Sequence, residues 1–241
     1  MTTFTTDDRI IAEKDGSFTA NIEPIPFAGL VTLEYPERLL EQGSDEWRLA
    51  KLGHVSGSSI ADVMAKGKSG EALTRKKYKT RLVAERLSMQ IQEGFTSSAM
   101  EWGIQTEYLA RQAYEVYSNT FVDKTGFWMH PTIKWLGCSP DGLVGDMGLV
   151  EIKCPNTTTH IDYLYADQIP TEYYKQMQCQ LWVTNREWCD FISFDPRLPL
   201  KNRLFVKRLH RSNDFITDME IEVKQFLQEV EDMIKILSGE K

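Results

Sequence analysis

The sequence lacks a long apolar run, a cysteine motif, an internal repeat and a low-complexity tract. No apolar run approaches the roughly 18 residues that cross a bilayer, and residues 1–8 lack the basic-then-apolar form of a signal peptide. The four cysteines and four histidines are scattered, without the spacing of a zinc or iron–sulfur site. We therefore expect a soluble, intracellular protein with reduced cysteines and no membrane contact.

The charge of the chain is uneven along its length. The formal net charge of -7 disfavours nucleic acid, because phosphate binding depends on Lys and Arg displacing counterions. Residues 66–86, however, hold eight Lys and Arg against two Glu, and residues 197–211 hold six Lys and Arg and no acid. A local basic surface on an acidic protein is therefore allowed, although such runs are more often solvated helix faces.

Length and pattern indicate one α/β domain preceded by an N-terminal arm. We expect the arm over residues 1–36, with one strand near 30–33, and a single domain over residues 37–241. Helices are predicted to begin near residues 44, 60, 72 and 98, and to cover 171–183 and 212–237. Strands are predicted at 121–122, 127–129, 133–136, 149–154, 189–194 and 204–208.

Two helices have apolar faces whose burial can be predicted. In the basic segment, the residues expected to point inward are Leu73, Leu82, Val83 and Leu87. In the C-terminal helix, apolar residues recur at three- and four-residue steps, and we expect them to pack on the protein's own core, with a subunit contact as the alternative. This C-terminal stripe consists of Phe215, Met219, Val223, Phe226, Val230, Met233 and Leu237.

The helix that begins near residue 98 carries a carboxylate in its apolar stripe. A carboxylate in such a place is costly unless it is paired or binds a metal. Glu107 is therefore either an ion-pair partner or loop cap within the fold, or a metal ligand. The other members of the stripe are Met100, Gly103, Ile104, Ala110 and Tyr114.

The residues most suited to catalysis are Asp141, Glu151 and Lys153. Asp141 lies in a Ser-Pro-Asp-Gly segment that predicts a tight turn, which would fix its carboxylate beside the following strand. Alternate side chains of a strand share a face, so Glu151 and Lys153 point together while the apolar residues between them point away. Carboxylates are suitable ligands for Mg²⁺, and a lysine beside the ion can orient or deprotonate an attacking water.

Each half of this pattern has a plain structural alternative. A Pro-Asp-Gly segment is usually only a turn, and Glu-x-Lys in a strand is often a solvated face with a weak surface pair. The joint order is more specific, because the proline–aspartate pair precedes by about ten residues a Glu-x-Lys within an apolar strand. Together the two halves resemble the PD-(D/E)xK nuclease signature.

Further ordered blocks carry a closer resemblance, to the phage lambda exonuclease or YqaJ-like viral recombinase family. The likeness extends from about residue 41 to the last helix and leaves the arm outside it. It implies a restriction-endonuclease-like core, in which a mixed β-sheet is flanked by helices, with a long C-terminal helix. The blocks are EQGSDEW at 41–47, KLG at 51–53, WGIQTE at 102–107, CSPDG at 138–142, EIKCP at 151–155, QMQ at 176–178 and WVT at 182–184.

The resemblance implies a Mg²⁺-dependent exonuclease that digests one strand of linear double-stranded DNA from its 5′ end. The remaining 3′ single-stranded overhang would pass to a single-strand annealing protein in phage-type homologous recombination. The resemblance also implies a homotrimeric ring around the DNA, in which only the channel need be basic. The expected location is the cytoplasm of a bacterial host, with the protein encoded by a phage or prophage.

The resemblance assigns a role to each residue of the site. The metal ligands implied are the carboxylates of Asp141, Glu151 and Glu107 and the backbone carbonyl of Ile152. They would hold two Mg²⁺ ions per site, with Mn²⁺ as the alternative metal. Lys153 matches the catalytic lysine, and Gln176 matches a glutamine in the site.

DNA contacts are implied at Lys51, Ser58, Lys68, Met100 and Ser139. Lys51 and Ser58 occupy the places of an arginine and a serine that bind a terminal 5′-phosphate. Because lysine lacks the bidentate fork of arginine, we expect the phosphate preference to be weaker, or shared with Arg48. Lys68 matches a residue that meets the single strand. Met100 matches an apolar wedge between the last base pairs, with a core position as its alternative.

Two other functions fit the same residues. The first is a structure- or sequence-specific DNA endonuclease on the same core. The second is an inactive DNA-binding or assembly module that retains the fold. The intact set of Asp141, Glu151 and Lys153 argues against the second.

Overall fold

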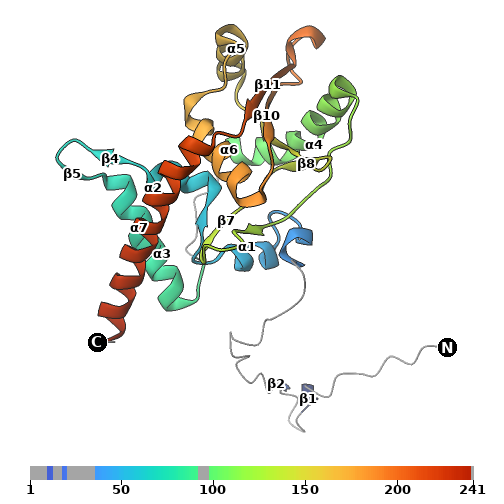
Figure 1. The fold of residues 1–241 in the computed structure, drawn as a ribbon. Coiled ribbons are helices and arrows are strands. Elements are labelled where there is room, and N and C mark those ends of the chain that lie inside the picture. The colour runs from blue at the N-terminus through green and yellow to red at the C-terminus, as the bar shows by residue number, and fades with distance from the viewer. Residues whose placement is uncertain (1–9, 13–17, 21–35, 92–97, 240–241) are drawn as a thin grey trace. The chain divides into compact units, whose positions relative to one another are not determined.

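A computed structural model describes residues 10–12, 18–20, 36–91 and 98–239 (Figure 1). The chain divides into two units, Met1–Tyr35 and Pro36–Lys241. In the first unit, β1 (Ile10–Ala12) pairs with β2 (Phe18–Ala20) in antiparallel fashion. The strand predicted near residues 30–33 lies outside the described residues.

The second unit mixes helices and strands, which confirms the α/β class predicted from the sequence. Its helices are α1 (Asp45–Lys51), α2 (Ile60–Val63), α3 (Leu73–Ser88), α4 (Ser98–Ser118), α5 (Thr157–Ala166), α6 (Thr171–Thr184) and α7 (Asn213–Ser238), with 3₁₀ segments η2 (Pro36–Leu39), η3 (Gly57–Ser59) and η4 (Leu200–Asn202). Its strands are β3 (Val55–Ser56), β4 (Lys66–Gly67), β5 (Gly70–Glu71), β6 (Trp128–Met129), β7 (Leu136–Cys138), β8 (Gly142–Val144), β9 (Gly148–Lys153), β10 (Trp188–Phe194) and β11 (Leu204–His210).

A mixed four-stranded sheet in the order β11-β10-β9-β8 forms the centre of this unit. The motif strand β9 runs parallel to β10 along its whole length and antiparallel to β8 over residues 148–150, so both of its edges are hydrogen-bonded in its first half. α5 and α6 make the crossover between the two parallel strands. A strand with two paired edges places its side chains at fixed positions on both faces of the sheet.

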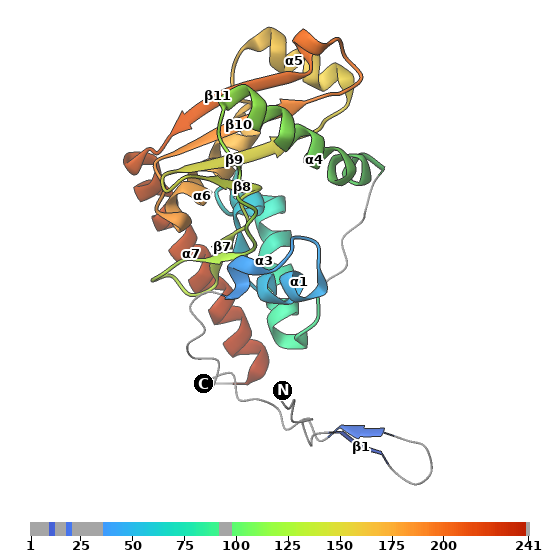
Figure 2. The same cartoon turned by 90° about the vertical axis from the view of Figure 1, so that its right-hand side faces the viewer.

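Alternating side chains of β9 separate the two faces, as the sequence pattern predicts. Val150 and Ile152 lie in a buried apolar cluster with Ala110 and Tyr114 of α4. Leu149 instead packs with α6 residues on the other face. Figure 2 shows α4 crossing the sheet, with α6 behind it. Glu151 shares the face of Leu149 and therefore points toward α6.

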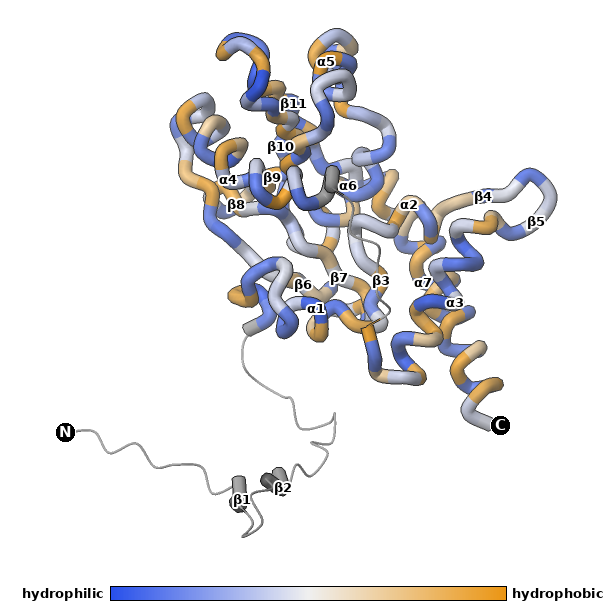
Figure 3. The backbone as a smooth tube through the Cα atoms, turned by 180° about the vertical axis from the view of Figure 1, so that it is seen from behind, coloured by the Kyte–Doolittle hydropathy of each residue, from blue (hydrophilic) through white to orange (hydrophobic). Residues whose placement is uncertain are grey.

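A second apolar cluster joins α3 and α7 to the smaller sheet β3-β7-β6. In Figure 1 the two helices lie side by side and extend away from the large sheet, and in Figure 3 hydrophobic positions recur along both. The buried residues of α7 include Met219, Val223, Phe226 and Val230, which confirms that its stripe packs on the protein's own core.

Several residues predicted to point inward are exposed. Leu73 and Leu87 of α3 are 65% and 45% exposed, because they lie in the first and last turns, and Tyr78 and Arg75 are buried instead. Leu237 is 64% exposed at the end of α7 for the same reason. The prediction that Ile104 lies in the buried stripe of α4 is also wrong. It is 73% exposed, because the buried face of α4 runs through Thr106, Ala110 and Tyr114.

Most predicted strands are present, with two exceptions. The strand predicted at 121–122 is absent, and Asp123 instead forms an isolated bridge to Leu143. The strand predicted at 133–136 begins only at Leu136, because the ring Nδ1 of His130 accepts the main-chain N–H of Ile133 and holds a turn there. The prediction omitted β8, α5 and the short β4–β5 hairpin.

The cysteines are free thiols, as expected. Cys138, Cys179 and Cys189 are buried and Cys154 is half-buried. Burial raises the pKa of the Cys179 thiol to about 12, which keeps it protonated and inert at neutral pH. None of the helices in the described ranges is both long enough and apolar enough to pass through a bilayer.

Candidate active site

The site begins at the link between β7 and β8, where Asp141 leaves the smaller sheet and enters the larger one. Its carboxylate Oδ2 accepts the main-chain N–H of Ile152 at 2.6 Å, which ties it to the motif strand. The tight turn predicted for this segment is wrong, because 139–141 form a bend between strands of different sheets. The expected consequence nevertheless holds, since the Asp141 carboxylate is fixed beside β9.

Side chains from α1 and the segment just before it hold the bend from outside. Gln42, just before α1, donates its amide to the carbonyl of Pro140 at 2.7 Å. The indole Nε1 of Trp47 donates to the Ser139 Oγ at 3.0 Å. Ser44 caps α1 by accepting the Trp47 N–H, which sets the direction from which the indole approaches. Neither Gln42 nor Trp47 was given a role from the sequence.

Glu151 is completely buried, yet both of its carboxylate oxygens accept hydrogen bonds. Oε1 accepts the amide of Gln176 at 2.6 Å and the ammonium of Lys153 at 2.5 Å. Oε2 accepts the amide of Gln180 at 2.6 Å. A buried carboxylate is tolerated only when donors replace its hydration, and here three side chains do so.

The structure thus brings Asp141, Glu151, Lys153 and Gln176 together, as the sequence predicted. It adds Gln180, to which the sequence gave no role although Gln176 and Gln180 have the four-residue spacing that puts both on one helix face. That spacing is the signal that would have found it.

The electrostatics of the site reflect an excess of acid. Burial raises the pKa of Asp141 well above its ordinary value, and the nearby carboxylates of Glu151 and Glu107 raise it further, with Lys153 opposing them. For Lys153, burial opposes the charge, but Glu151 and Asp141 raise its pKa above the ordinary value. A group of carboxylates with this mutual repulsion favours a bound cation.

Glu107 lies at the edge of this group. Its carboxylate influences Asp141, so the helix carboxylate does lie near the motif. It also accepts a hydrogen bond from Arg111 at 2.7 Å, so the ion-pair alternative is realised too. Across the described ranges, no three His, Cys, Asp or Glu side chains converge on one point in the manner of a metal site.

The donors present nevertheless suit one Mg²⁺ ion. Mg²⁺ is commonly held by one or two carboxylates and keeps several waters, and Asp141 and Glu151 supply two such groups, linked by the Asp141–Ile152 hydrogen bond. Since Arg111 contacts the Oε1 of Glu107, a second ion would draw on the Oε2 of Glu107 or replace that ion pair. The backbone carbonyl of Ile152 remains a predicted ligand.

The residues predicted to bind a DNA end lie on α1 and the segment after it. The Lys51 ammonium lies 3.8 Å from the centroid of the Trp47 ring, whose indole is bonded to Ser139. Burial, and then the guanidinium of Arg81, lowers the pKa of Lys51 to about 8. Ser58 is exposed, with its Oγ 3.1 Å from that of Ser56. Lys51 and Ser139 are thus connected through one indole.

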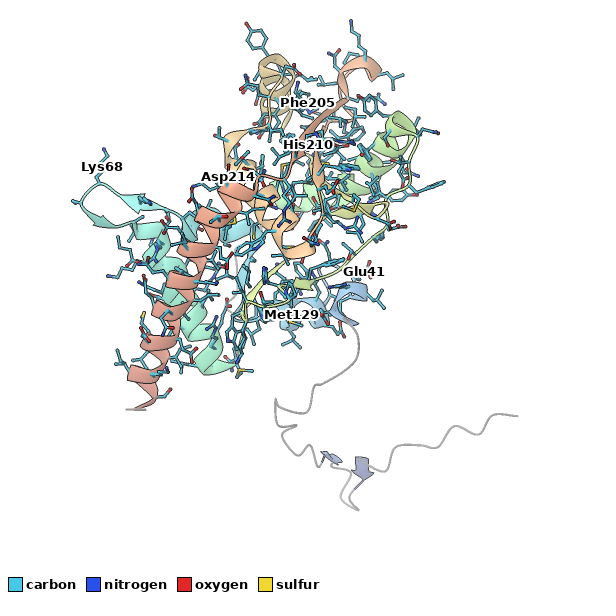
Figure 4. The ribbon with its side chains drawn as sticks, viewed as in Figure 1. Glu41, Lys68, Met129, Phe205, His210 and Asp214 are labelled. Atoms are coloured by element: carbon cyan, nitrogen blue, oxygen red, sulfur yellow. The ribbon has the colours of Figure 1, made fainter. Side chains whose placement is uncertain are left out.

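The remaining DNA-binding predictions are spread over other surfaces. Lys68 is exposed at the tip of the β4–β5 hairpin and points away from the rest of the unit (Figure 4). Arg48 forms an exposed ion pair with Asp45 at 2.9 Å. Met100 belongs to α4, but its side chain lies outside the described residues, so neither the wedge nor the core position is tested.

The basic segments are partly neutralised. Arg75 and Lys79 of α3 each contact Glu229 of α7, at 2.7 Å in both cases. In the second segment, Arg208 pairs with Asp190 at 2.8 Å. The basic groups left exposed on α3 include Lys76 and Lys77.

Comparison with known proteins identifies one family and several exonucleases of similar fold. Residues 46–187 match the family described as the YqaJ-like viral recombinase domain. LHK-Exo, an alkaline exonuclease from Laribacter hongkongensis, is 42% identical with a TM-score of 0.77, over 81% of this chain and 97% of that chain. Its complex with dAMP matches equally well. A phage-related exonuclease from Haemophilus somnus 129PT shares the fold, at 16% identity and a TM-score of 0.63, over 76% of this chain and 96% of that one. No curated protein matches.

Proposed function

Because the chain belongs to the YqaJ-like viral recombinase family and is a nuclease, we propose that it digests one strand of linear double-stranded DNA from the 5′ end. The observation that carries the proposal is the meeting of Asp141, Glu151 and Lys153 at one end of β9. Two carboxylates with an ammonium beside them are the groups that metal-assisted phosphodiester hydrolysis requires.

Each side chain has a part in the proposed hydrolysis. Asp141 and Glu151 hold Mg²⁺, or alternatively Mn²⁺, and a second ion would draw on Glu107. A metal held there would supply polarisation of the scissile phosphate and would make an attacking water more acidic. Lys153 orients that water and adds positive charge where negative charge develops on the phosphate oxygens. Gln176 donates to Glu151 and so limits the rotation of its carboxylate.

Recognition of the DNA end is proposed for the residues around Trp47. Lys51 and Ser58 would bind a 5′-phosphate, and Ser139 would contact the strand next to Asp141. Lys68, on its exposed hairpin, would meet the single strand. In support, the Lys51 ammonium and the Ser139 hydroxyl both contact the Trp47 ring system, so an end bound at Lys51 lies close to the bend that holds Asp141.

The proposed assembly follows from the family. We propose a homotrimeric ring around the duplex, a 3′ overhang as product, and a single-strand annealing protein as its recipient. The exposed lysines of α3 are compatible with a ring whose channel is basic while the whole chain is acidic. Size-exclusion chromatography with light scattering distinguishes a trimer from a monomer.

The deciding experiment uses a linear duplex labelled separately on each strand. With Mg²⁺, we expect each strand to be degraded from its 5′ end only, faster when that end is phosphorylated, and no degradation when the metal is chelated. Loss of label from the 3′ ends first, or intact duplex after prolonged incubation, contradicts the proposal.

A structure- or sequence-specific endonuclease on the same core remains the second candidate, because Asp141, Glu151 and Lys153 suit either reaction. Covalently closed circular DNA separates the two. An exonuclease leaves it intact, whereas an endonuclease nicks or linearises it. Protein that binds DNA ends without cleaving either substrate would instead indicate an inactive binding module.

A further inference from the structure

The helix α6 presents two glutamine amides to a single carboxylate. Gln176 and Gln180 are four residues apart, so their side chains lie one above the other on the helix surface. Their Nε2 atoms contact different oxygens of Glu151, Oε1 and Oε2, each at 2.6 Å. Together the two amides therefore resist rotation of the carboxylate about its Cγ–Cδ bond more than either does alone.

The two oxygens of Glu151 have different surroundings. Oε1 accepts from both Gln176 and Lys153, and these two donors occupy the lone-pair sites available on that oxygen. Oε2 accepts from Gln180. A lone pair of Oε2 is therefore available to a cation while all three of these donors stay in place.

Gln180 is itself held tightly. It is 1% exposed, and a Cβ added at Gly57 would lie 3.7 Å from its Cγ and 3.2 Å from the Cβ of Cys138. The absence of a side chain at Gly57 thus lets η3 approach Cys138 of β7 closely, with Gln180 in ordinary contact beside them. A polar group confined in this way presents its donor in one direction.

The burial of Gln180 also affects its side-chain oxygen, Oε1. Its Oε1 is buried, and no hydrogen-bond partner for it is found in the described part of the chain. A buried acceptor without a partner destabilises the fold, and an apolar side chain of similar size would avoid that cost. Packing alone therefore does not account for a glutamine here, whereas its donor to Glu151 does.

We propose that Gln180 is a positioning residue of the metal site, which aims Oε2 of Glu151 at a divalent cation shared with Asp141. This inference rests on the proposed function, because it assumes that Glu151 is a metal ligand. Gln180 acts only through Glu151 and need not touch DNA.

The same helix supplies a matched control. Gln178 is also completely buried, but its amide donates to the carbonyl of His210 and its Oε1 accepts the N–H of Ser212, both at 2.9 Å. Those contacts join α6 to β11 and to the start of α7. Gln178 thus has equal burial and a structural role away from the carboxylates.

The test titrates Mn²⁺ into the full-length protein without DNA and follows free Mn²⁺ by electron paramagnetic resonance. Gln180→Leu is expected to weaken Mn²⁺ binding by about 10- to 100-fold, the usual effect of removing a partner of a metal ligand. Gln178→Leu is expected to lower the melting temperature more, yet to keep Mn²⁺ affinity within about twofold of wild type. In DNA digestion, raising the Mg²⁺ concentration should restore kcat to Gln180→Leu.

Gln180→Asn provides a second variant if the leucine variant does not fold. It keeps an amide but is one methylene too short to reach Oε2, so it should weaken Mn²⁺ binding as well. Equal Mn²⁺ affinity in wild type and in a folded Gln180 variant overturns the inference, as does a wild type that binds no Mn²⁺. If Mn²⁺ binding depends on Gln180 but no DNA is digested, the inference stands and the proposed function fails.

Discussion

Trp47 and Ser139, 92 residues apart in the chain, are joined by a hydrogen bond of 3.0 Å between the indole Nε1 and the serine Oγ. The face of the same indole carries the ammonium of Lys51. One side chain therefore connects the cation proposed to read the DNA end with the bend that holds Asp141. In the proposed reaction, the position of this ring would set the distance between the bound DNA end and Asp141.

Trp47→Phe removes the hydrogen bond and keeps an aromatic face for Lys51. We expect a loss of about 1 kcal/mol in the free energy of unfolding, the usual net value of one hydrogen bond. We also expect the ratio of kcat/KM for 5′-phosphorylated over unphosphorylated duplex to fall, because the position of Lys51 relative to Asp141 is no longer fixed. Trp128→Phe is the control, since its indole donates to the Thr125 hydroxyl at 2.7 Å and not to Ser139. An equal change of the ratio in both variants contradicts the expectation.

Lys153→Met should lower kcat by about 10²- to 10³-fold, because a preorganised charge beside the reacting phosphate is lost. DNA binding should change little. Lys207→Met is the matched control, because Lys207 also lies on the large sheet but forms an exposed pair with Asp167 at 2.8 Å. Rates are measured in single turnover on 5′-phosphorylated duplex. Near-normal digestion by Lys153→Met would show that the catalytic assignment is wrong.

The preference for a 5′-phosphate should depend on pH through Lys51. Burial, together with repulsion from Arg81 and against attraction by Glu85, lowers the pKa of Lys51 from its ordinary 10.5 to about 8. A lysine is charged below its pKa and neutral above it, so phosphate binding weakens as the pH rises through about 8. Between pH 7 and pH 9 the ratio of kcat/KM for phosphorylated over unphosphorylated duplex should fall by up to about tenfold.

Lys51→Arg is the control for this pH effect. Arginine stays charged across this range and adds a bidentate fork, so the ratio should be larger than in wild type and flat with pH. The ratio cancels pH effects on the shared hydrolytic step. A wild-type ratio that does not change between pH 7 and pH 9 excludes Lys51 as the titrating reader.

Glu229 should make the pairing of α7 with α3 sensitive to acid. Its hydrogen bonds from Arg75, and then from Lys79, lower its pKa from 4.5 to about 2. Because the folded-state pKa is depressed, the stabilisation is present above pH 4.5 and is lost as the pH falls toward 2. Glu229→Gln should cost about 2 kcal/mol at pH 7 and progressively less at lower pH, measured by urea unfolding.

Glu220→Gln on the same helix is the comparison for Glu229. Glu220 pairs with Lys224 on the helix surface, so its loss should cost under about 0.5 kcal/mol at any pH. Parallel pH profiles for the two variants would remove Glu229 as the acid-sensitive contact.

The long periodic elements were predictable from the sequence because local pattern and tertiary burial agree in them. Alternate apolar side chains of β9 pack in different clusters on the two faces of the sheet, and α7 keeps one stripe from Ile216 to Val230. α4 shows where this agreement fails. Ile104 and other apolar residues lie on its exposed face, so pattern alone chose a phase that differs from the buried one. Short elements such as β8 depend on pairing with distant strands, which leaves little local signal.

The candidate site likewise contains residues that the sequence identifies and residues that it does not. The sequence identified Asp141, Glu151 and Lys153 because they are close in the chain and of unmistakable chemistry. Gln180 was missed because a buried amide on a helix has no chemical signature until its partner is known. Trp47 was missed because its partner Ser139 lies 92 residues further along the chain, and no local pattern records such a contact.

The pairing of β9 on both edges has a consequence for motion. Amide protons exchange with solvent only when their hydrogen bonds open, and a strand bonded on both sides opens at nearly the cost of unfolding the whole domain. Leu149 and Val150, which are paired with both β8 and β10, should therefore exchange most slowly, and Glu151 and Lys153 follow them directly on the same strand, paired with β10. α1 and the β4–β5 hairpin, which carry Lys51 and Lys68, open far more readily. In the proposed reaction, the catalytic side chains would thus stay on a rigid strand while the residues proposed to bind the DNA end move more freely.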